Sequence, residues 1–542
     1  MKEFLEKLSG FWAKLRRSKV FWIALIIIVQ SVVYAAYGAG KNYIHMDEAY
    51  SLGLANYERT EILENEEFFN EWHNAGYYED YLAVDESEQG DFAAVYNNQR
   101  DDVHPPLYYL LLRIGMELTP GEFTVWTGII LNMVIFAVEA AFLYLVVWKL
   151  LGGGAKDSEK NVEMKAGILT LAASLTIAAV NTVIYVRMYA LLTMWVTISA
   201  YLHLRLLDTK KVSPKLLVVI GATTLFGFLT QYYFLFFTIP MFVVAAVRYL
   251  RAKRWKEFWA YFVAQVGAGV VSLIIWPWSI KHLFFGYRGQ GAMENLLNFG
   301  QLGEQLGAFF GVVTLNVFHY TLPLILIAMF ALAIYGLRKG KRLPTGRKED
   351  GYFYALLWPM LAYFVIVAIA SPYREIRYMD AVCGLMFVLV MLGLYELLGV
   401  ACREKARNIV MAGVLAVTVI LPLPLGIKPE TQYGNFSTAT NFVEEHKEAP
   451  LLYIYDMGNN RFLDDITLFT IADWSYIMSE QKYTVEDFER VLETKDLGDG
   501  VVVIANYGWD NQEYLDKLKE ATGLTEQEYI FRLNAADLYY IH

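Results

Sequence analysis

The chain has 542 residues, of which 56% are hydrophobic, 15% aromatic and only 19% charged, with a net charge of -10. Ordinary soluble proteins carry about 25% charged residues, so this composition excludes an ordinary soluble globular protein. Apolar segments near twenty residues long recur along most of the chain, and a helix of that length crosses a hydrocarbon core about 30 Å thick. The sequence therefore predicts a polytopic membrane protein.

The first apolar segment, VFWIALIIIVQSVVYAAYGA at 20–39, follows the basic stretch KLRRSK. It is too long for a signal-peptide core and lacks a small-residue cleavage site, so we interpret it as a retained anchor. Ten further apolar segments follow, which gives about 11 transmembrane helices in a mainly α fold. Their expected bounds are 20–39, 123–150, 166–186, 188–207, 215–233, 235–250, 259–280, 306–336, 352–371, 379–400 and 409–427.

The loops between these spans alternate in charge. KLRRSK, KDSEKNVEMK, RLLDTKK, RYLRAKRWK, LRKGKRLPTGRK and CREKAR all fall on one side, which the positive-inside rule identifies as the cytoplasm. The other side receives the acidic segment 40–105, the loop 281–305, the short SPYREIRYM and everything after residue 428. We therefore expect a cytoplasmic N-terminus and an extracytoplasmic C-terminus.

The two cysteines, Cys383 and Cys402, fall in an apolar run and a basic loop, so the segments placed outside have no disulfide framework. This cysteine usage and the character of the loops favour a bacterial plasma membrane.

The last part of the chain, 429–542, is polar and mixed. LLYIYDM and VVVIANYG have the pattern of buried strands, whereas TVEDFERVLETK and NQEYLDKLKEATG have helical spacing. We expect a transmembrane domain over 1–428 and a small extracytoplasmic α/β domain over 429–542.

The large first outer loop, 40–105, begins with YIHMDEAYSLG and ends in QRDDVHPPLYYLLLR. Two adjacent acids, Asp47 and Glu48, stand at the mouth of the first span. A proline pair opens the following helix, because proline fits the first turn of a helix but not its interior. LYYLLLRIGMEL is too short to span the bilayer and is expected to lie along its surface.

An Asp-Glu pair after the first span, together with the closing His-Pro-Pro-Leu-Tyr-Tyr, resembles the polytopic glycosyltransferases of the GT-C class. The similarity is to the branch of protein O-mannosyltransferases and bacterial aminoarabinose transferases (glycosyltransferase family 39-like). YVRMYALLTMW, at 185–195, is similar to that branch's Arg-x-Tyr-Ala-Leu segment, and REIRYMDAVCGLMF resembles its late Arg-Tyr segment. The resemblance covers roughly 20–400. It implies transfer of a sugar from a polyprenyl-phosphate carrier to an acceptor outside the membrane.

This reaction needs few groups. A carboxylate takes the proton of the attacking hydroxyl, and arginines stabilise the departing phosphate with their planar fork of donors. The resemblance implies that Asp47 is the base, and Glu48 completes the candidate catalytic pair, with acceptor binding or loop orientation as its expected task. The candidate donor-phosphate site comprises Arg187, Tyr189, Arg374, Arg377 and Tyr378.

A second cluster at the end of the outer loop forms a candidate acceptor or loop site: Asp101, Asp102, His104 and Tyr108. One histidine beside two acids does not define a metal site, so we expect no obligatory cofactor, although a divalent metal is not excluded. The alternative interpretation of this cluster is a solvated loop end. For Asp47 and Glu48 the alternative is a pair of solvated acids at the end of a helix.

Arg187 has two interpretations as well, because a charge near a span is either a functional group or an outer-turn residue that reaches the interface. Arg374 and Arg377 would be neighbours if SPYREIRYM were helical. Gln231, Tyr232 and Tyr233 fit interfacial anchors, and His319 fits a core histidine.

Rival functions remain at this stage. A polysaccharide ligase or polymerase acting on a lipid-linked oligosaccharide would need much the same groups, and a secondary transporter would also have many spans. Transporters usually show repeated halves and helices broken near the midplane, and the sequence shows neither. A scaffolding protein would leave the placement of the acids and arginines unexplained. The expected partners are a polyprenyl-phosphate sugar donor, an unknown envelope acceptor (protein, lipid or wall polymer) and the lipid bilayer, with no nucleic acid.

Overall fold

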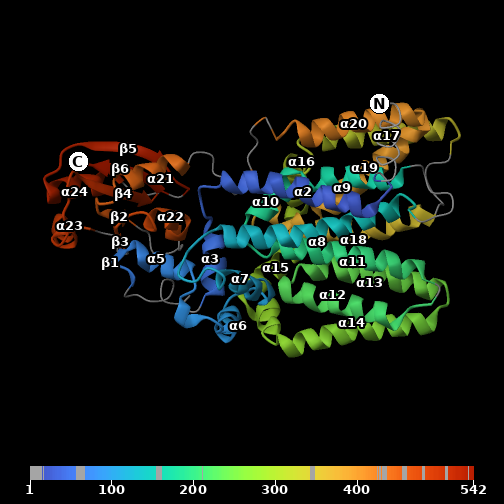
Figure 1. Cartoon of the computed structure of the whole chain (residues 1–542), viewed down its shortest axis with the longest axis horizontal. Helices are drawn as coiled ribbons and strands as arrows, with labels where there is room; N and C mark the ends of the chain where they lie inside the picture. The colour runs from blue at the N-terminus through green and yellow to red at the C-terminus, as the bar shows by residue number, and fades with distance from the viewer. Residues whose placement is uncertain are drawn as a thin grey trace, which may run out of the picture.

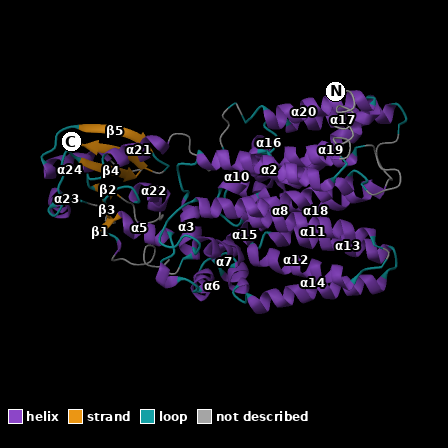
Figure 2. Cartoon of the chain, viewed as in Figure 1, coloured by secondary structure: helices purple, strands orange, loops and turns teal. Residues whose placement is uncertain are grey.

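The computed structural model describes residues 15, 17–56, 68–153, 161–209, 211–341, 348–423, 425, 429, 436–454, 461–478, 483–506, 511–534 and 536–542. Long helices form a bundle that makes up most of the molecule, and one β-sheet lies beyond one end of it (Figures 1 and 2). The short helices of the first outer loop lie between the bundle and the sheet (Figure 1).

The bundle contains α2 (Lys19–Ala39), α8 (Trp126–Leu150), α9 (Val162–Ser174), α10 (Ile177–Ile184), α11 (Tyr189–Asp208), α12 (Pro214–Thr230), α13 (Phe234–Arg251), α14 (Trp255–Ile275), α16 (Leu302–Asn316), α17 (Leu322–Arg338), α18 (Lys348–Ala370), α19 (Asp380–Ala401) and α20 (Glu404–Leu415). Shorter helices at the end facing the sheet are α3 (Met46–Ala55), α5 (Ala75–Leu82), α6 (Phe92–Asp101), α7 (Leu107–Met116) and α15 (Tyr287–Leu297).

Seven helices among the described residues are long and apolar enough to cross a membrane, and an eighth span arises if α9 and α10 are counted as one bent span. α12 and α17, with 17 residues each, are apolar but shorter. Helices occupy every one of the expected spans, so the mainly α polytopic architecture is confirmed, but some of the spans are interrupted.

Backbone conformation explains the interruptions. The expected span 306–336 is split into α16 and α17 because His319 and Tyr320 adopt positive φ values of 47° and 62°, which a helix does not tolerate. The span 166–186 bends by 60° between α9 and α10. Thr176 is extended there and its side chain caps α10, so a new helix begins in a new direction.

The sheet has six strands in the order β1-β3-β2-β4-β6-β5. The central strands β3, β2 and β4 are parallel, and β1, β6 and β5 run antiparallel to their neighbours. The strands are β1 (Trp72–Asn74), β2 (Leu451–Ile454), β3 (Trp474–Met478), β4 (Val501–Asn506), β5 (Gln527–Arg532) and β6 (Ala536–Ile541). The expected α/β character of the C-terminal region is therefore confirmed, with one edge strand, β1, contributed by the first outer loop.

Alternation along the strands buries both faces of the sheet. Leu452 and Ile454 pack with residues of α23 (Val485–Leu492) and α24 (Asn511–Thr522) in a separate small core. Their neighbours Leu451 and Tyr453 face the other way, toward α21 (Phe436–Glu445) and α22 (Ile466–Phe469), and belong to the core shared with the bundle. The sheet is thus packed onto the end of the molecule that carries the first outer loop.

Candidate active site

Helix α3 carries the two acids found in the sequence. The backbone N–H of Asp47 donates to Nδ1 of His45 at 3.0 Å, and the N–H of His45 donates to Glu48 at 2.9 Å, so the helix start is capped from both sides. Acids in the first turn also suit the positive end of the helix dipole. The local sequence HMDE therefore fixes the helix start that presents Asp47.

Three side chains from other segments converge on Asp47. The hydroxyl of Tyr185 donates to its carboxylate at 2.9 Å, and Arg377 forms an ion pair with the same carboxylate oxygen. Nη2 of Arg187 lies 3.8 Å from the other carboxylate oxygen, and its Nη1 donates to the backbone carbonyl of Asp47 at 2.8 Å. The site therefore joins residues from three distant parts of the sequence.

The charges around Asp47 decide its protonation. Burial by itself raises the pKa of this carboxyl, but Arg187 and Arg377 outweigh burial and hold the pKa well below its usual range. His45 is partly buried as well, and this burial lowers the pKa of its imidazole despite the nearby carboxylates. At neutral pH the site therefore contains an ionised Asp47 beside a neutral histidine.

Arg187 lies in the break between α10 and α11 and is only 6% exposed. A glycine in α8 makes room for this break, because a Cβ on Gly128 would overlap the side chain of Val186. Nη1 of Arg187 also donates to Ser51 at 3.0 Å. An outer-turn arginine that reaches the interface would be exposed to solvent. Arg187 is instead buried and has a carboxylate partner, as the functional interpretation requires.

Arg377 lies in a single 3-10 turn, η5 (Ile376–Tyr378), just before α19. It is 8% exposed and pairs with Glu375 at 2.6 Å as well as with Asp47. Among the described residues, no hydrogen-bond partner reaches the Nε of Arg187 or the Nε of Arg377. Each of these two buried cations therefore keeps one N–H donor without a partner among the described residues.

Aromatic side chains line the same region. Tyr189 stacks with Tyr185 at a centroid distance of 6.3 Å and meets Tyr378 edge-on at 6.2 Å. Tyr378 in turn contacts Tyr233, with centroids 6.0 Å apart. The expected donor-site residues Tyr189 and Tyr378 are thus brought beside Arg377, and Tyr233, interpreted above as an anchor, adjoins them.

Glu48 is fully buried and its carboxylate is fully engaged. It pairs with Lys41 at 2.7 Å and accepts from the backbone N–H of Val186 at 2.7 Å, in addition to capping His45. These bonds tie the start of α3 to the segment that carries Arg187. Glu48 therefore has a positioning role, and of the two acids Asp47 is the one that is partly open to solvent.

The candidate acceptor cluster is divided by the structure. His104 pairs with Asp102 at 2.8 Å. Burial lowers the pKa of its imidazole, although the carboxylates of Asp102 and Asp47 act in the opposite direction. Asp101 is exposed and pairs with Arg100 and Lys281. Tyr108 is buried and donates to Asn132 at 3.2 Å. The Asp102–His104 pair is near enough to Asp47 and Arg187 to interact with them electrostatically.

No group of three or more His, Cys, Asp or Glu side chains among the described residues is arranged to hold a metal ion.

Arg374 lies outside the cluster. Its guanidinium pairs with Glu304 at 2.5 Å and is about half exposed, whereas Arg377 points to Asp47. The condition under which the two arginines would share a helical face is not met, because Glu375 is extended and the regular helix starts only at Asp380. Two residues three positions apart therefore lie in different environments.

Sequence reasoning missed four residues that shape the site. Tyr185 is the first residue of the motif YVRMYALLTMW but is not among the predicted site residues. Lys41 and His45 both precede the acid pair. Asp464, from the C-terminal domain, accepts from the backbone N–H of Met46 at 3.0 Å and from the hydroxyl of Tyr43 at 2.8 Å. Nothing in the local sequence around Asp464 signals this contact, because its partners are more than 400 residues away.

Comparison with solved structures agrees with this geometry at the level of the fold. The chain superposes on the crystal structure of ArnT from Cupriavidus metallidurans bound to undecaprenyl phosphate with a TM-score of 0.51 and 12% identity, over 96% of this chain and 98% of that one. The apo state of the same protein gives a TM-score of 0.49 and 11% identity, with the same coverage. No family model matches the sequence, and no curated protein matches it. The chain has the fold of ArnT, an aminoarabinose transferase of the GT-C class, which confirms the fold expected from the sequence motifs.

Proposed function

We propose that this protein is a membrane glycosyltransferase that moves a sugar from a polyprenyl-phosphate donor to an acceptor hydroxyl on the extracytoplasmic face of the membrane. The observation that carries the proposal is the pairing of Asp47 with two buried arginines, Arg187 and Arg377. The likeness in fold to a transferase whose crystal structure holds undecaprenyl phosphate supports the lipid-phosphate donor.

The reaction follows from these groups. The acceptor oxygen attacks the anomeric carbon of the donor sugar, and its proton passes to the Asp47 carboxylate. The bond between that carbon and the phosphate oxygen breaks, and polyprenyl phosphate leaves with the electron pair. Arg187 and Arg377 stabilise the charge on the leaving phosphate through their unused Nε–H donors. The phosphate departs as a stable anion, so no general acid is needed.

The free enzyme holds Asp47 in a weakly basic state, because both arginines stabilise its charge. A bound donor phosphate competes for the same guanidinium groups. As the phosphate draws Arg377 and Arg187 toward itself, the Asp47 carboxylate loses stabilisation and its affinity for a proton rises. The Asp47 carboxylate would therefore become a stronger base only when the donor is bound. Without a donor it would remain a weak base.

The tyrosines extend the donor site. Tyr189 and Tyr378 present ring faces and edges beside Arg377, a surface suited to the sugar or the first isoprene units. Asp102 and His104 remain candidates for the acceptor side, since they adjoin the site from the other end of the first outer loop. The same groups would serve a ligase that transfers a lipid-linked oligosaccharide.

The topology proposed with this function follows from the basic loops, with a cytoplasmic N-terminus and an extracytoplasmic C-terminal domain in a bacterial plasma membrane. In that orientation α3, the helix that carries Asp47, lies on the extracytoplasmic side, near the sheet (Figure 1).

The test is release of free polyprenyl phosphate. The purified protein is incubated with undecaprenyl-phosphate sugars that differ in the sugar, together with envelope extract as the source of acceptor, with and without EDTA. We expect release with at least one donor, no effect of EDTA, and loss of release in Asp47→Asn but not in Glu79→Gln, an exposed acid in α5. Release of similar size from the Asp47→Asn protein would contradict the proposal. Loss of activity in EDTA would assign a metal to the site.

A further inference from the structure

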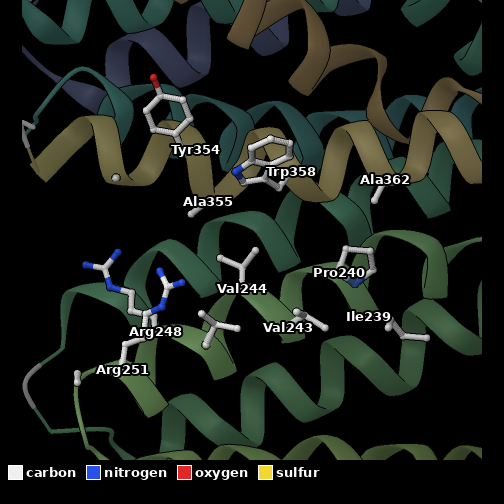
Figure 3. A pocket seen from close by; sticks show the side chains of 13 residues that line it. Ile239, Pro240, Val243, Val244, Arg248, Arg251, Tyr354, Ala355, Trp358 and Ala362 are labelled. Atoms are coloured by element: carbon white, nitrogen blue, oxygen red, sulfur yellow. The ribbon is translucent and has the colours of Figure 1, made fainter. Parts of the chain in front are cut away.

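A groove runs between α13 and α18, from Ile239 to Ala252 on the α13 side (Figures 1 and 3). Its volume is about 940 Å³. Apolar side chains of both helices line most of it, with Val243 and Val247 from α13 and Trp358 from α18 among them. Arg248 and Arg251 stand together at one end, next to Tyr354 (Figure 3).

The groove is separate from the Asp47 site. α13 starts beside the site, where the ring of Tyr233 contacts Tyr378. Arg248 lies fifteen positions further along the chain, which corresponds to about 20 Å at a rise of 1.5 Å per residue. Tyr233 and the arginine end of the groove therefore lie at opposite ends of α13, and the apolar wall between them begins at Ile239.

The dimensions of the groove fit one lipid chain. Its α13 wall runs from Ile239 to Ala252, about 20 Å at a rise of 1.5 Å per residue. Half of a hydrocarbon core is about 15 Å thick. An acyl chain of one leaflet therefore matches the apolar part of the groove, and its headgroup would reach the end that carries the arginines.

The charge at that end selects the headgroup. Arg248 and Arg251 occupy the last turn of α13, are both exposed, and form no ion pair with a described residue. Two like charges three positions apart on a helix repel each other, and a bound anion would relieve that repulsion. Trp358 and Tyr354 are 61% and 42% exposed along the opposite wall, which leaves large ring surfaces for a lipid to cover.

We propose that this groove is a binding site for an anionic phospholipid, with one acyl chain between α13 and α18 and the phosphate at Arg248 and Arg251. In the topology proposed above, this end of the bundle meets the cytoplasmic leaflet, whose anionic lipids are attracted to basic residues near the surface. Lipid binding in the groove needs no sugar donor, so it can be tested independently of the proposed reaction.

The first experiment is a thermal melt of the full-length protein in a neutral detergent with added phosphatidylglycerol or phosphatidylcholine of the same chain length. A ligand that binds only the folded state stabilises it in proportion to ln(1 + [L]/Kd). We expect a rise in Tm of several degrees with phosphatidylglycerol alone. The rise should disappear in the double variant Arg248→Gln/Arg251→Gln.

The matched control is Arg338→Gln, an exposed arginine in the last turn of α17, outside the groove, which should respond to lipid as the unmodified protein does. Equal shifts with both lipids, or an unchanged shift in the double variant, would overturn the proposal. A shift with undecaprenyl phosphate but not with phosphatidylglycerol would overturn it too, since the groove would then belong to the carrier lipid.

A second measurement reports the acyl chain. Phosphatidylglycerol brominated on its acyl chains should quench the tryptophan fluorescence of the protein, and the Trp358→Phe variant should lose a distinct part of that quenching. The control variant Trp255→Phe removes a similarly exposed tryptophan at the start of α14, outside the groove. It should keep the part of the quenching that is lost in Trp358→Phe. Quenching that is identical in the Trp358→Phe and unmodified proteins would exclude a chain in the groove. Formation of a dimer that hides Trp358 from the lipid would also overturn the proposal.

Discussion

The guanidinium of Arg377 forms an ion pair with the carboxylate of Asp47, although 330 positions separate the two residues in the chain. The pair brings the first outer loop into contact with the turn before α19. It gives the site both a carboxylate and a cation in one place.

Asp47→Asn should lower the rate of sugar transfer by about 10²-fold or more, the usual contribution of a general base. The amide cannot take the acceptor proton, but it keeps the size of the side chain and no longer competes as an anion for Arg187 and Arg377, so the donor affinity should not fall. Single-turnover transfer and donor binding, measured on the same preparation, separate the two effects. A normal rate in this variant would move the base to Asp102.

Arg377→Lys should weaken donor binding about tenfold, which corresponds to about 1.4 kcal/mol, because lysine keeps the charge but loses the planar fork. The affinity for undecaprenyl phosphate is the quantity to measure, beside a thermal melt that checks folding. Arg374→Lys is the comparison, since this exposed side chain pairs with Glu304 and should leave the affinity unchanged. If Arg374→Lys has the larger effect, the phosphate site lies nearer to α16 than proposed.

Asp464→Ala should lower the rate of transfer while leaving the donor affinity close to normal. The Asp464 carboxylate holds the first N–H of α3 and the hydroxyl of Tyr43, so its loss frees the helix start that presents Asp47. Asp464→Asn keeps an acceptor oxygen and should recover part of the rate. Asp473→Ala, an exposed acid of the same domain, is the control. Equal effects of Asp464→Ala and Asp473→Ala would indicate a general disturbance of the domain.

His45 should make the stability of the protein depend on pH. Burial lowers the pKa of the folded imidazole below the value of about 6.5 expected in the unfolded chain. The stability that neutral His45 contributes is therefore present above about pH 6.5 and is lost as the pH falls through the lowered folded pKa. The charged groups that act on it are Asp47, Asp464, Arg377 and Glu48.

The measurement is Tm between pH 5 and 8 for the unmodified protein and for His45→Asn, which can cap the helix without titrating. The decrease in Tm toward low pH should be smaller in His45→Asn. His542→Asn, at the exposed C-terminal residue, should leave the decrease unchanged. An identical pH profile in His45→Asn would show that other groups set the acid limit.

Reporter fusions test the topology. A reporter placed after Arg254, between α13 and α14, should be active in the cytoplasm, and one placed after His542 should be active outside. The basic loops that all fall on one side of the predicted spans lead to this expectation. Both reporters on the same side would contradict the proposed orientation, and with it the cytoplasmic leaflet assigned to the groove between α13 and α18.

The sequence by itself determined the class of architecture. An apolar stretch of about 20 residues in a bilayer must satisfy its own backbone hydrogen bonds, so composition and length predict helices almost without tertiary information. The strands of the C-terminal domain were also predictable, since the apolar runs LLYIYDM and VVVIANYG contain β2 and β4. Less was predictable about where helices break, since the bend before α10 and the turn between α16 and α17 depend on a few backbone angles.

Only the tertiary structure decided which charges meet. Arg374 and Arg377 looked equivalent in the sequence, yet one pairs with Glu304 at the surface and the other with Asp47 in the interior. Asp47 and Glu48 are adjacent, but helix geometry directs one toward the arginines and the other toward Lys41. Contacts between residues hundreds of positions apart arise from how whole helices pack, and local sequence patterns carry no signal of that packing.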